Sequence, residues 1–199
     1  MIRARITEGA FLTNSYLWEN DGALSIIDVG AKNTSVLSKI EAEKLPLKCT
    51  ILTHNHLDHI CGLSPALFEK PIFMHEYDLN NLTSEYIDYM YNAFGASLFK
   101  NEKDFREFKD FLLANKKNIT PVIDGDVVEN LRVMLTSGHT KGSISLVSDS
   151  EKLIFTGDTM FYSGYGRTDL QSGCEKEIMA SLKKLYTLVT SGYEIYPGH

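Results

Sequence analysis

The chain has 199 residues, 43% of them hydrophobic and 23% charged, which fits a single domain with its own core. With 20 Lys and Arg against 26 Asp and Glu, its net charge of -6 argues against binding to nucleic acid or to an anionic membrane. No apolar run is long enough for a membrane span or a signal peptide, so we expect a cytoplasmic protein. Cys49, Cys61 and Cys174 lack a C-x-x-C spacing, which argues against a disulfide framework.

Short β-branched and aromatic runs bounded by turn residues predict strands along the whole chain. An N-terminal strand contains Tyr16 and Trp18, and the other expected strands cover residues 25–27, 50–52, 71–74, 131–135, 143–147, 153–155 and 193–196.

Helical patterns separate these strands. Asn33 is the expected N-cap of a first helix, and Ser64 with Pro65 is the expected start of a second. An apolar stripe of Ile178, Leu182 and Leu185 predicts a helix packed on a sheet. This mixture of elements predicts sheets whose faces are covered by helices.

Residues 77–118 interrupt this alternation. They contain nine aromatic residues and many charges but no strand pattern, so we expect an inserted pair of helices around Gly95. The aromatic side chains are expected to anchor this insertion to the core. A lid beside a substrate pocket, or a homodimer surface, is the alternative role.

Three of the six histidines, His54, His56 and His59, fall within six residues, with Asp58 among them. Packing alone does not explain such a cluster, because buried imidazoles need partners and protonated ones repel each other. Imidazole and carboxylate are ligands for divalent metals. The cluster follows an expected strand, so it lies in a strand-end loop, where functional sites of sheet proteins concentrate.

Three other expected strands end in the same kind of residue. They run into Gly138-His139, Gly157-Asp158 and Pro197-Gly198-His199. If these strands end at one edge of the sheets, all of the ligand candidates meet there.

The ordered motifs His54-x-His56-x-Asp58-His59, Gly138-His139, Gly157-Asp158 and Pro197-Gly198-His199 resemble those of the metallo-β-lactamase fold superfamily. The resemblance covers nearly the whole chain. It implies an α+β fold, an αββα sandwich of two face-to-face mixed β-sheets with helices outside. Residues 1–199 would form one such domain with a helical insertion at about 77–118.

The same resemblance implies a site for two divalent metal ions. His54, His56 and His139 would hold the first ion, and Asp58, His59 and His199 the second, with Asp158 bridging them. Zinc is the favoured metal, and iron and manganese are the alternatives.

Two further stretches are similar to the hydroxyacylglutathione hydrolase (glyoxalase II)-like branch. Asp28, in the run 26–30, would support the metal ligands. Arg167, in the run 157–170, would order a loop beside them together with Asp169 rather than bind substrate. Members of this branch carry a C-terminal glutathione-binding domain beyond the position of His199. No residue of this sequence corresponds to that domain, so the sequence leaves open both glutathione recognition and whether His199 is the native C-terminus.

These features predict a metal-dependent hydrolase of a small thioester or a related acyl compound. Two cations about 3.5–4 Å apart lower the pKa of a shared water, and Asp58 can orient or deprotonate that water. Thioesters are the favoured substrate class, because a thiolate leaves without needing a proton. The expected partner is a small molecule, without nucleic acid or membrane, and the aromatic insertion offers a homodimer contact.

Other functions fit the same ligand pattern. A persulfide dioxygenase of this fold would use one iron, held by His54, His139 and Asp158. A metal-dependent ribonuclease is less favoured, because the net charge is -6 and no basic region accompanies the ligands. A metal-dependent scaffold without activity is the non-enzymatic alternative.

Overall fold

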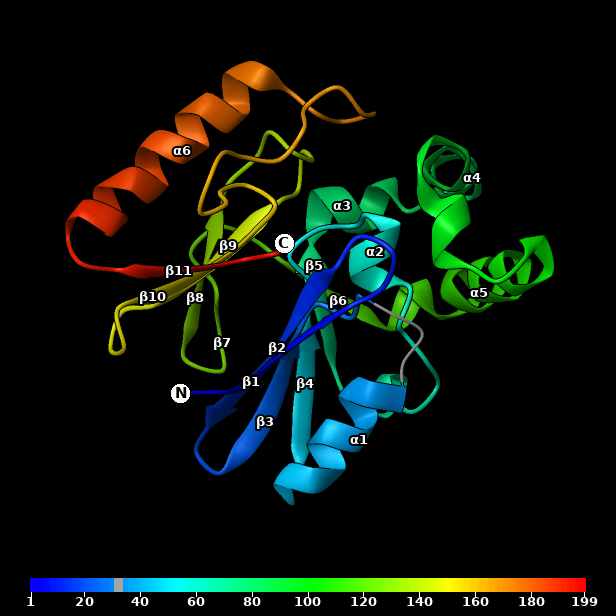
Figure 1. Ribbon diagram of the computed structural model, residues 1–199, viewed down its shortest axis with the longest axis horizontal. Coiled ribbons are helices and arrows are strands. Elements are labelled where there is room, and N and C mark those ends of the chain that lie inside the picture. The colour runs from blue at the N-terminus through cyan, green and yellow to red at the C-terminus, as the bar shows by residue number, and fades with distance from the viewer. Residues whose placement is uncertain (31–33) are drawn as a thin grey trace.

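Two β-sheets lie face to face in the computed structural model of the protein, with helices outside them (Figure 1). The structure describes residues 1–30 and 34–199, so the N-cap predicted at Asn33 lies outside the described residues. No helix within these ranges combines the length and apolar character that crossing a bilayer requires.

Both sheets are mixed, as expected. The first has six strands in sequence order, antiparallel from β1 to β3 and parallel from β3 to β6. These are β1 (Ile2–Glu8), β2 (Thr13–Asn20), β3 (Ala23–Ile27), β4 (Leu47–Ile51), β5 (Ile72–His75) and β6 (Ile119–Val122).

The second sheet has the order β11-β10-β9-β8-β7, in which only β10 and β11 pair in parallel. Its strands are β7 (Val127–Val128), β8 (Leu131–Leu135), β9 (Ile144–Ser148), β10 (Leu153–Gly157) and β11 (Glu194–Pro197). The short strands β6 and β7 and the edge strand β1 were not predicted from the sequence.

The α-helices are α1 (Thr34–Glu43), α2 (Leu57–Ile60), α3 (Glu76–Asn81), α4 (Ser84–Ala93), α5 (Glu102–Asn115) and α6 (Glu175–Thr190). Short 3₁₀ helices cover Leu67–Glu69, Gly95–Leu98 and Lys116–Asn118. The helix predicted to start at Ser64 and Pro65 was wrong, because only the three-residue 3₁₀ helix forms there.

The aromatic stretch is the connection between β5 and β6, which pair in parallel and therefore need a crossover. The side chains of Thr83 and Asn101 cap the N-termini of α4 and α5. Phe105 stacks on Tyr91 at 3.8 Å between ring centroids and is buried. Most of the aromatic residues thus pack this connection onto the core, as expected, whereas Tyr77 and Tyr89 are exposed. The homodimer contact stays a prediction.

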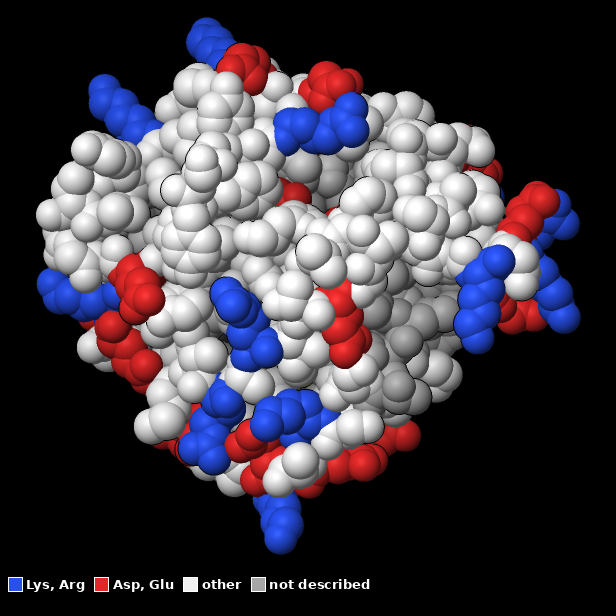
Figure 2. Space-filling model, in the orientation of Figure 1, with Lys and Arg blue, Asp and Glu red and all other residues white. Residues whose placement is uncertain are grey.

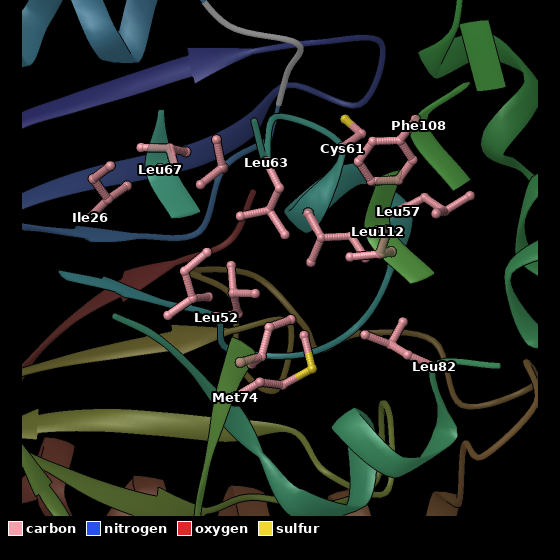
Figure 3. Packing of buried hydrophobic residues seen from close by; sticks show 14 of the residues in the cluster. Ile26, Leu52, Leu57, Cys61, Leu63, Leu67, Met74, Leu82, Phe108 and Leu112 are labelled. Carbon is pink, nitrogen blue, oxygen red and sulfur yellow. The ribbon is translucent and has the colours of Figure 1, made fainter. Parts of the chain in front are cut away.

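The core has three layers because the central strands bury both faces. Neighbouring residues of a strand point to opposite sides, so Ile27 packs between the two sheets and Ile26 packs under the helices of the first sheet. Figure 3 shows that second layer, where Leu57 of α2 and Leu112 of α5 come together. The third layer lies under α6, where Leu185 packs on the second sheet.

Phe155 of β10 is the centre of the layer between the sheets. Its ring lies 5.1 Å from Tyr16, 6.0 Å from Trp18 and 5.7 Å from Tyr196, measured between centroids. Aromatic residues of both sheets therefore meet on this side chain.

We expect Phe155→Ala to lower the free energy of unfolding by about 3–5 kcal/mol, because the substitution leaves a cavity between the sheets. Urea denaturation measures this loss. Tyr186→Ala on α6 is the control, because Tyr186 is exposed, and it should change stability by less than about 0.5 kcal/mol. Equal effects of the two substitutions would contradict this account of the core.

Candidate metal centre

All seven predicted ligands lie at one edge of the sandwich, where four strands end. The loop after β4 contains His54 and His56, and α2 contains Asp58 and His59. His139, Asp158 and His199 follow β8, β10 and β11. In Figure 1 the chain end after β11 lies beside the loop that leads into α2, and Nε2 of His199 lies 3.2 Å from Nε2 of His59, so residues from both sheets meet there.

The ligand atoms of these residues form three overlapping groups, each with all atoms within 4.8 Å of one another. The groups are His54, His56 and His139; His54, His59 and Asp158; and Asp58, His59 and His199. The first and last are the two sets that the family resemblance implies. The middle group shares His54 with the first group and His59 with the last, and it adds Asp158 between them.

The carboxylate of Asp158 faces histidines of both sets. Its Oδ1 lies 3.3 Å from Nε2 of His59, and its Oδ2 lies 3.3 Å from Nε2 of His199 and 3.6 Å from Nε2 of His139. This placement suits a ligand shared by two cations.

Three buried imidazole nitrogens have no hydrogen-bond partner: Nε2 of His54, of His56 and of His139. Leaving a buried polar atom unsatisfied costs about 1–3 kcal/mol, so three of them beside a carboxylate need an explanation. A divalent cation supplies it, since these atoms are ligands of the type that zinc, iron and manganese accept. The residues present therefore fit a metal centre.

The protonation states also fit. Burial lowers the pKa of His54, His56 and His139, so these imidazoles are neutral and keep a lone pair for a metal. Burial alone would raise the pKa of Asp158, but His59 and His199 hold it well below its usual range. Asp158 is therefore an ionised ligand.

The pKa values of the two remaining ligand histidines, His59 and His199, shift upward instead. Burial works to lower the pKa of His59, but the carboxylates of Asp158, Asp58 and Asp28 raise it well above its ordinary value. Burial also opposes the shift at His199, where Asp158 and Asp58 raise the pKa to about 9. A cation that replaces these protons would meet a site already rich in negative charge.

Asp28 supports this arrangement from behind. Its Oδ2 accepts a hydrogen bond from Nδ1 of His59 at 2.8 Å, which leaves Nε2 of His59 facing the site. The same carboxylate accepts from the backbone N–H and the hydroxyl of Thr53, both at 2.7 Å. Asp28 has φ 57°, in the left-handed region, and such strained backbone is often found at functional sites.

Backbone carbonyls orient two more histidines. Nδ1 of His139 donates to the carbonyl of Arg167 at 2.8 Å, and Nδ1 of His199 donates to the carbonyl of Phe11 at 2.9 Å. In both rings Nε2 is left toward the cluster. Arg167 therefore contacts a ligand candidate through its main chain, while its guanidinium pairs with Asp169.

Asp78 was not predicted from the sequence; it lies in the first turn of α3 and is only 1% exposed. Its carboxylate accepts hydrogen bonds from the backbone N–H of Asn55 at 3.0 Å, the backbone N–H of Gly142 at 2.8 Å and the hydroxyl of Thr140 at 2.7 Å. It thus ties the loop of His54 and His56 to the loop of His139. Its place just after the strand that ends at His75 was the available clue.

A cavity of about 340 Å³ opens onto the cluster. His56, Asp58, His139, Asp158 and His199 line it on one side. Figure 2 shows acidic atoms inside a hollow near the middle of this face, with mostly uncharged residues around it. The hollow is a place where a small molecule can reach the ligand candidates.

The buried carboxyl group of Asp78 should make the free energy of unfolding depend on pH. Burial raises its pKa from 3.8 to about 6, although three hydrogen bonds oppose the shift. The folded protein therefore keeps this proton to a higher pH than the unfolded chain, and ionisation of Asp78 costs stability as the pH rises from about 4 through 6.

Asp78→Asn lacks this ionisation. We expect the variant to be less stable than the wild type, and the deficit to shrink by about 2 kcal/mol from pH 4.5 to pH 7, at about 1.4 kcal/mol per pKa unit. Urea denaturation across this range measures it. Asp110→Asn, at an exposed position of α5, is the control and should show no such trend. A deficit that grows with pH would contradict the assignment.

Known proteins are similar to this chain in sequence and in fold. The chain is 28% identical over 195 residues to a probable metallo-hydrolase of Streptococcus pyogenes, covering 94% of this chain and 78% of the relative. It is 27% identical to the hydroxyacylglutathione hydrolase GloC of Haemophilus influenzae, covering 96% of this chain and 86% of that protein. The crystal structure of TTHA1623 in a di-iron-bound form superposes with a TM-score of 0.80 at 25% identity, covering 98% of this chain and 91% of that one.

The model of one protein family matches residues 9–199, a range that includes every ligand candidate. The two mixed sheets with outer helices are the fold of the structural neighbours. The chain belongs to the metallo-beta-lactamase superfamily.

Proposed function

We propose that the protein is a two-metal hydrolase of small thioesters or related acyl compounds, with zinc as the favoured metal. The observation that carries the proposal is the convergence of three unpartnered histidine nitrogens with a carboxylate that faces both ligand sets. Two cations bound there would make hydroxide available at neutral pH and stabilise the negative charge that develops on a carbonyl oxygen.

We assign the ligands as the resemblance implies. His54, His56 and His139 would hold one ion, and Asp58, His59 and His199 the other, with Asp158 shared. Asp28 would fix the orientation of His59, and the carbonyl of Arg167 that of His139.

Asp58 is the proposed general base. It is ionised, because His59 and His199 lower its pKa against the effect of burial. Its Oδ2 accepts a hydrogen bond from the hydroxyl of Thr13 at 3.2 Å, and the residue lines the cavity. A carboxylate held in this way can orient a water molecule and take its proton.

The overall reaction is hydrolysis. The oxygen of water adds to the acyl carbon, the carbon–sulfur bond breaks, and a carboxylate and a thiolate are released. Of the two protons of the water, one passes to Asp58 and the other protonates the thiolate in solvent. A thiolate leaves without protonation, so the pocket needs no separate general acid. The relationship to GloC, named as a hydroxyacylglutathione hydrolase, supports a thioester as the substrate class.

The first test is the metal content of protein purified without added metal. We expect about two zinc ions per chain by elemental analysis, since the first and last of the three groups of ligand atoms are the two sets that the resemblance implies. Two iron ions would keep the hydrolase and change the metal, in line with the di-iron neighbour. A single iron held by His54, His139 and Asp158, with oxygen consumption on a persulfide, would replace the hydrolase by the dioxygenase alternative.

Asp158→Asn tests the shared ligand. We expect bound metal to fall below two per chain and thioester turnover to fall by about 100-fold or more, since even outer partners of a metal site cost 10–100-fold. Asp149→Asn is the control, because Asp149 forms an exposed pair with Arg132 on the second sheet. Turnover and metal content both at the wild-type level in Asp158→Asn would overturn the proposal.

A further inference from the structure

The walls of the pocket are apolar right up to the metal ligands. Phe11 comes from the β1–β2 turn and Phe94 from the end of α4, and their rings meet edge to face at 5.7 Å. The ring of Phe94 also lies 5.7 Å from His56, and Phe161 lies 6.1 Å from His199. Leu170 completes this set of side chains.

These walls adjoin the ligand candidates directly. A substrate bound at those candidates would lie within reach of Phe94 and Phe161, because each ring lies against a candidate imidazole. A cavity of about 340 Å³ with such walls suits a small apolar acyl group.

The charged side chains of the pocket also favour an uncharged substrate. Among the described residues that line it, Arg167 is the one Lys or Arg side chain. Its Nε and Nη2 donate to the two carboxylate oxygens of Asp169, both at 2.7 Å. This two-pronged contact uses the face of the guanidinium that would otherwise bind a carboxylate of a substrate.

We propose that the enzyme acts on uncharged, apolar acyl thioesters, and that Asp169 sets this specificity by occupying Arg167. The inference rests on the proposed hydrolase and adds its substrate class. An anionic substrate must displace Asp169 or bind beside an Arg–Asp pair without net charge, and it gains little from either. The apolar acyl group, in contrast, gains from the contact with Phe11, Phe94 and Phe161.

The test uses four thioesters that combine two acyl groups with two thiols. The acyl groups are phenylacetyl, which is apolar, and lactoyl, which is polar. The thiols are N-acetylcysteamine, which is neutral, and glutathione, which carries two carboxylates. We expect the highest kcat/KM for phenylacetyl-N-acetylcysteamine and the lowest for lactoylglutathione, measured on protein loaded with two metal ions.

Asp169→Asn isolates the charge effect. We expect the ratio of kcat/KM for phenylacetylglutathione over phenylacetyl-N-acetylcysteamine to rise by up to about fivefold, because an exposed ion pair between the freed guanidinium and a carboxylate of glutathione is worth at most about 1 kcal/mol. The rise should shrink in 1 M salt, which screens exposed charges. Arg167→Gln combined with Asp169→Asn should return the ratio to the wild-type value.

Asp149→Asn is the matched control. It breaks a second two-pronged pair, between Asp149 and Arg132, that lies outside the pocket. The ratio should stay at the wild-type value in this variant. An equal rise in Asp149→Asn and Asp169→Asn would overturn the role of Asp169.

The outcomes separate the two proposals. Hydrolysis with lactoylglutathione as the best substrate would overturn the specificity and leave the hydrolase standing. Hydrolysis with an unchanged ratio in a folded Asp169→Asn, checked by circular dichroism, would also overturn the role of Asp169. No hydrolysis of any of the four thioesters by the two-metal protein would overturn the proposed function, and this inference with it.

Discussion

Three hydrogen bonds converge on the carboxylate of Asp28, and the geometry of the metal centre depends on them. One comes from the imidazole of His59 and two come from Thr53, the residue before His54. A single buried side chain thus fixes both ends of the loop that carries four of the seven ligand candidates. The strained φ of Asp28 is sustained by backbone hydrogen bonds: its own N–H donates to the carbonyl of Ile51 at the end of β4 at 3.0 Å, and the N–H of Val29 donates to the carbonyl of His59 at 2.8 Å.

Asp78 links a loop of the first sheet to a loop of the second, whereas Asp28 fixes the two ends of a single loop. Residue 78 belongs to the connection between β5 and β6, which also supplies Tyr86, whose hydroxyl donates to Asn55 at 2.8 Å. Asn55 lies between His54 and His56, so the helical connection supports the ligands from outside. The same connection supplies Phe94 to the pocket wall. Its aromatic residues therefore serve packing, ligand support and pocket shape together.

The ligand candidates could be predicted from the sequence because each follows a strand of strong local pattern. The central strands and α6 were predictable for the same reason, being apolar on both faces or along one stripe. Strand β1 escaped prediction because it lies at an edge, where exposed residues such as Arg3 and Arg5 alternate with partly buried ones. Asp78 and the turn at Phe11 escaped because their contacts join segments far apart in the chain. Arg167 contacts the ligand candidate His139 through its backbone carbonyl, and no side-chain pattern reveals such a contact.

The ligand candidates divide between the two sheets, and this division has a mechanical consequence. Residues 54–59 follow a strand of the first sheet, whereas His139, Asp158 and His199 follow strands of the second. Cations held by both groups would act as a clasp that joins the layers at their open edge. Free metal at 100 times its dissociation constant would add about 2.7 kcal/mol of stability, and separating the layers would require releasing it. The aromatic interior around Phe155 and the metal edge would then resist unfolding as one unit.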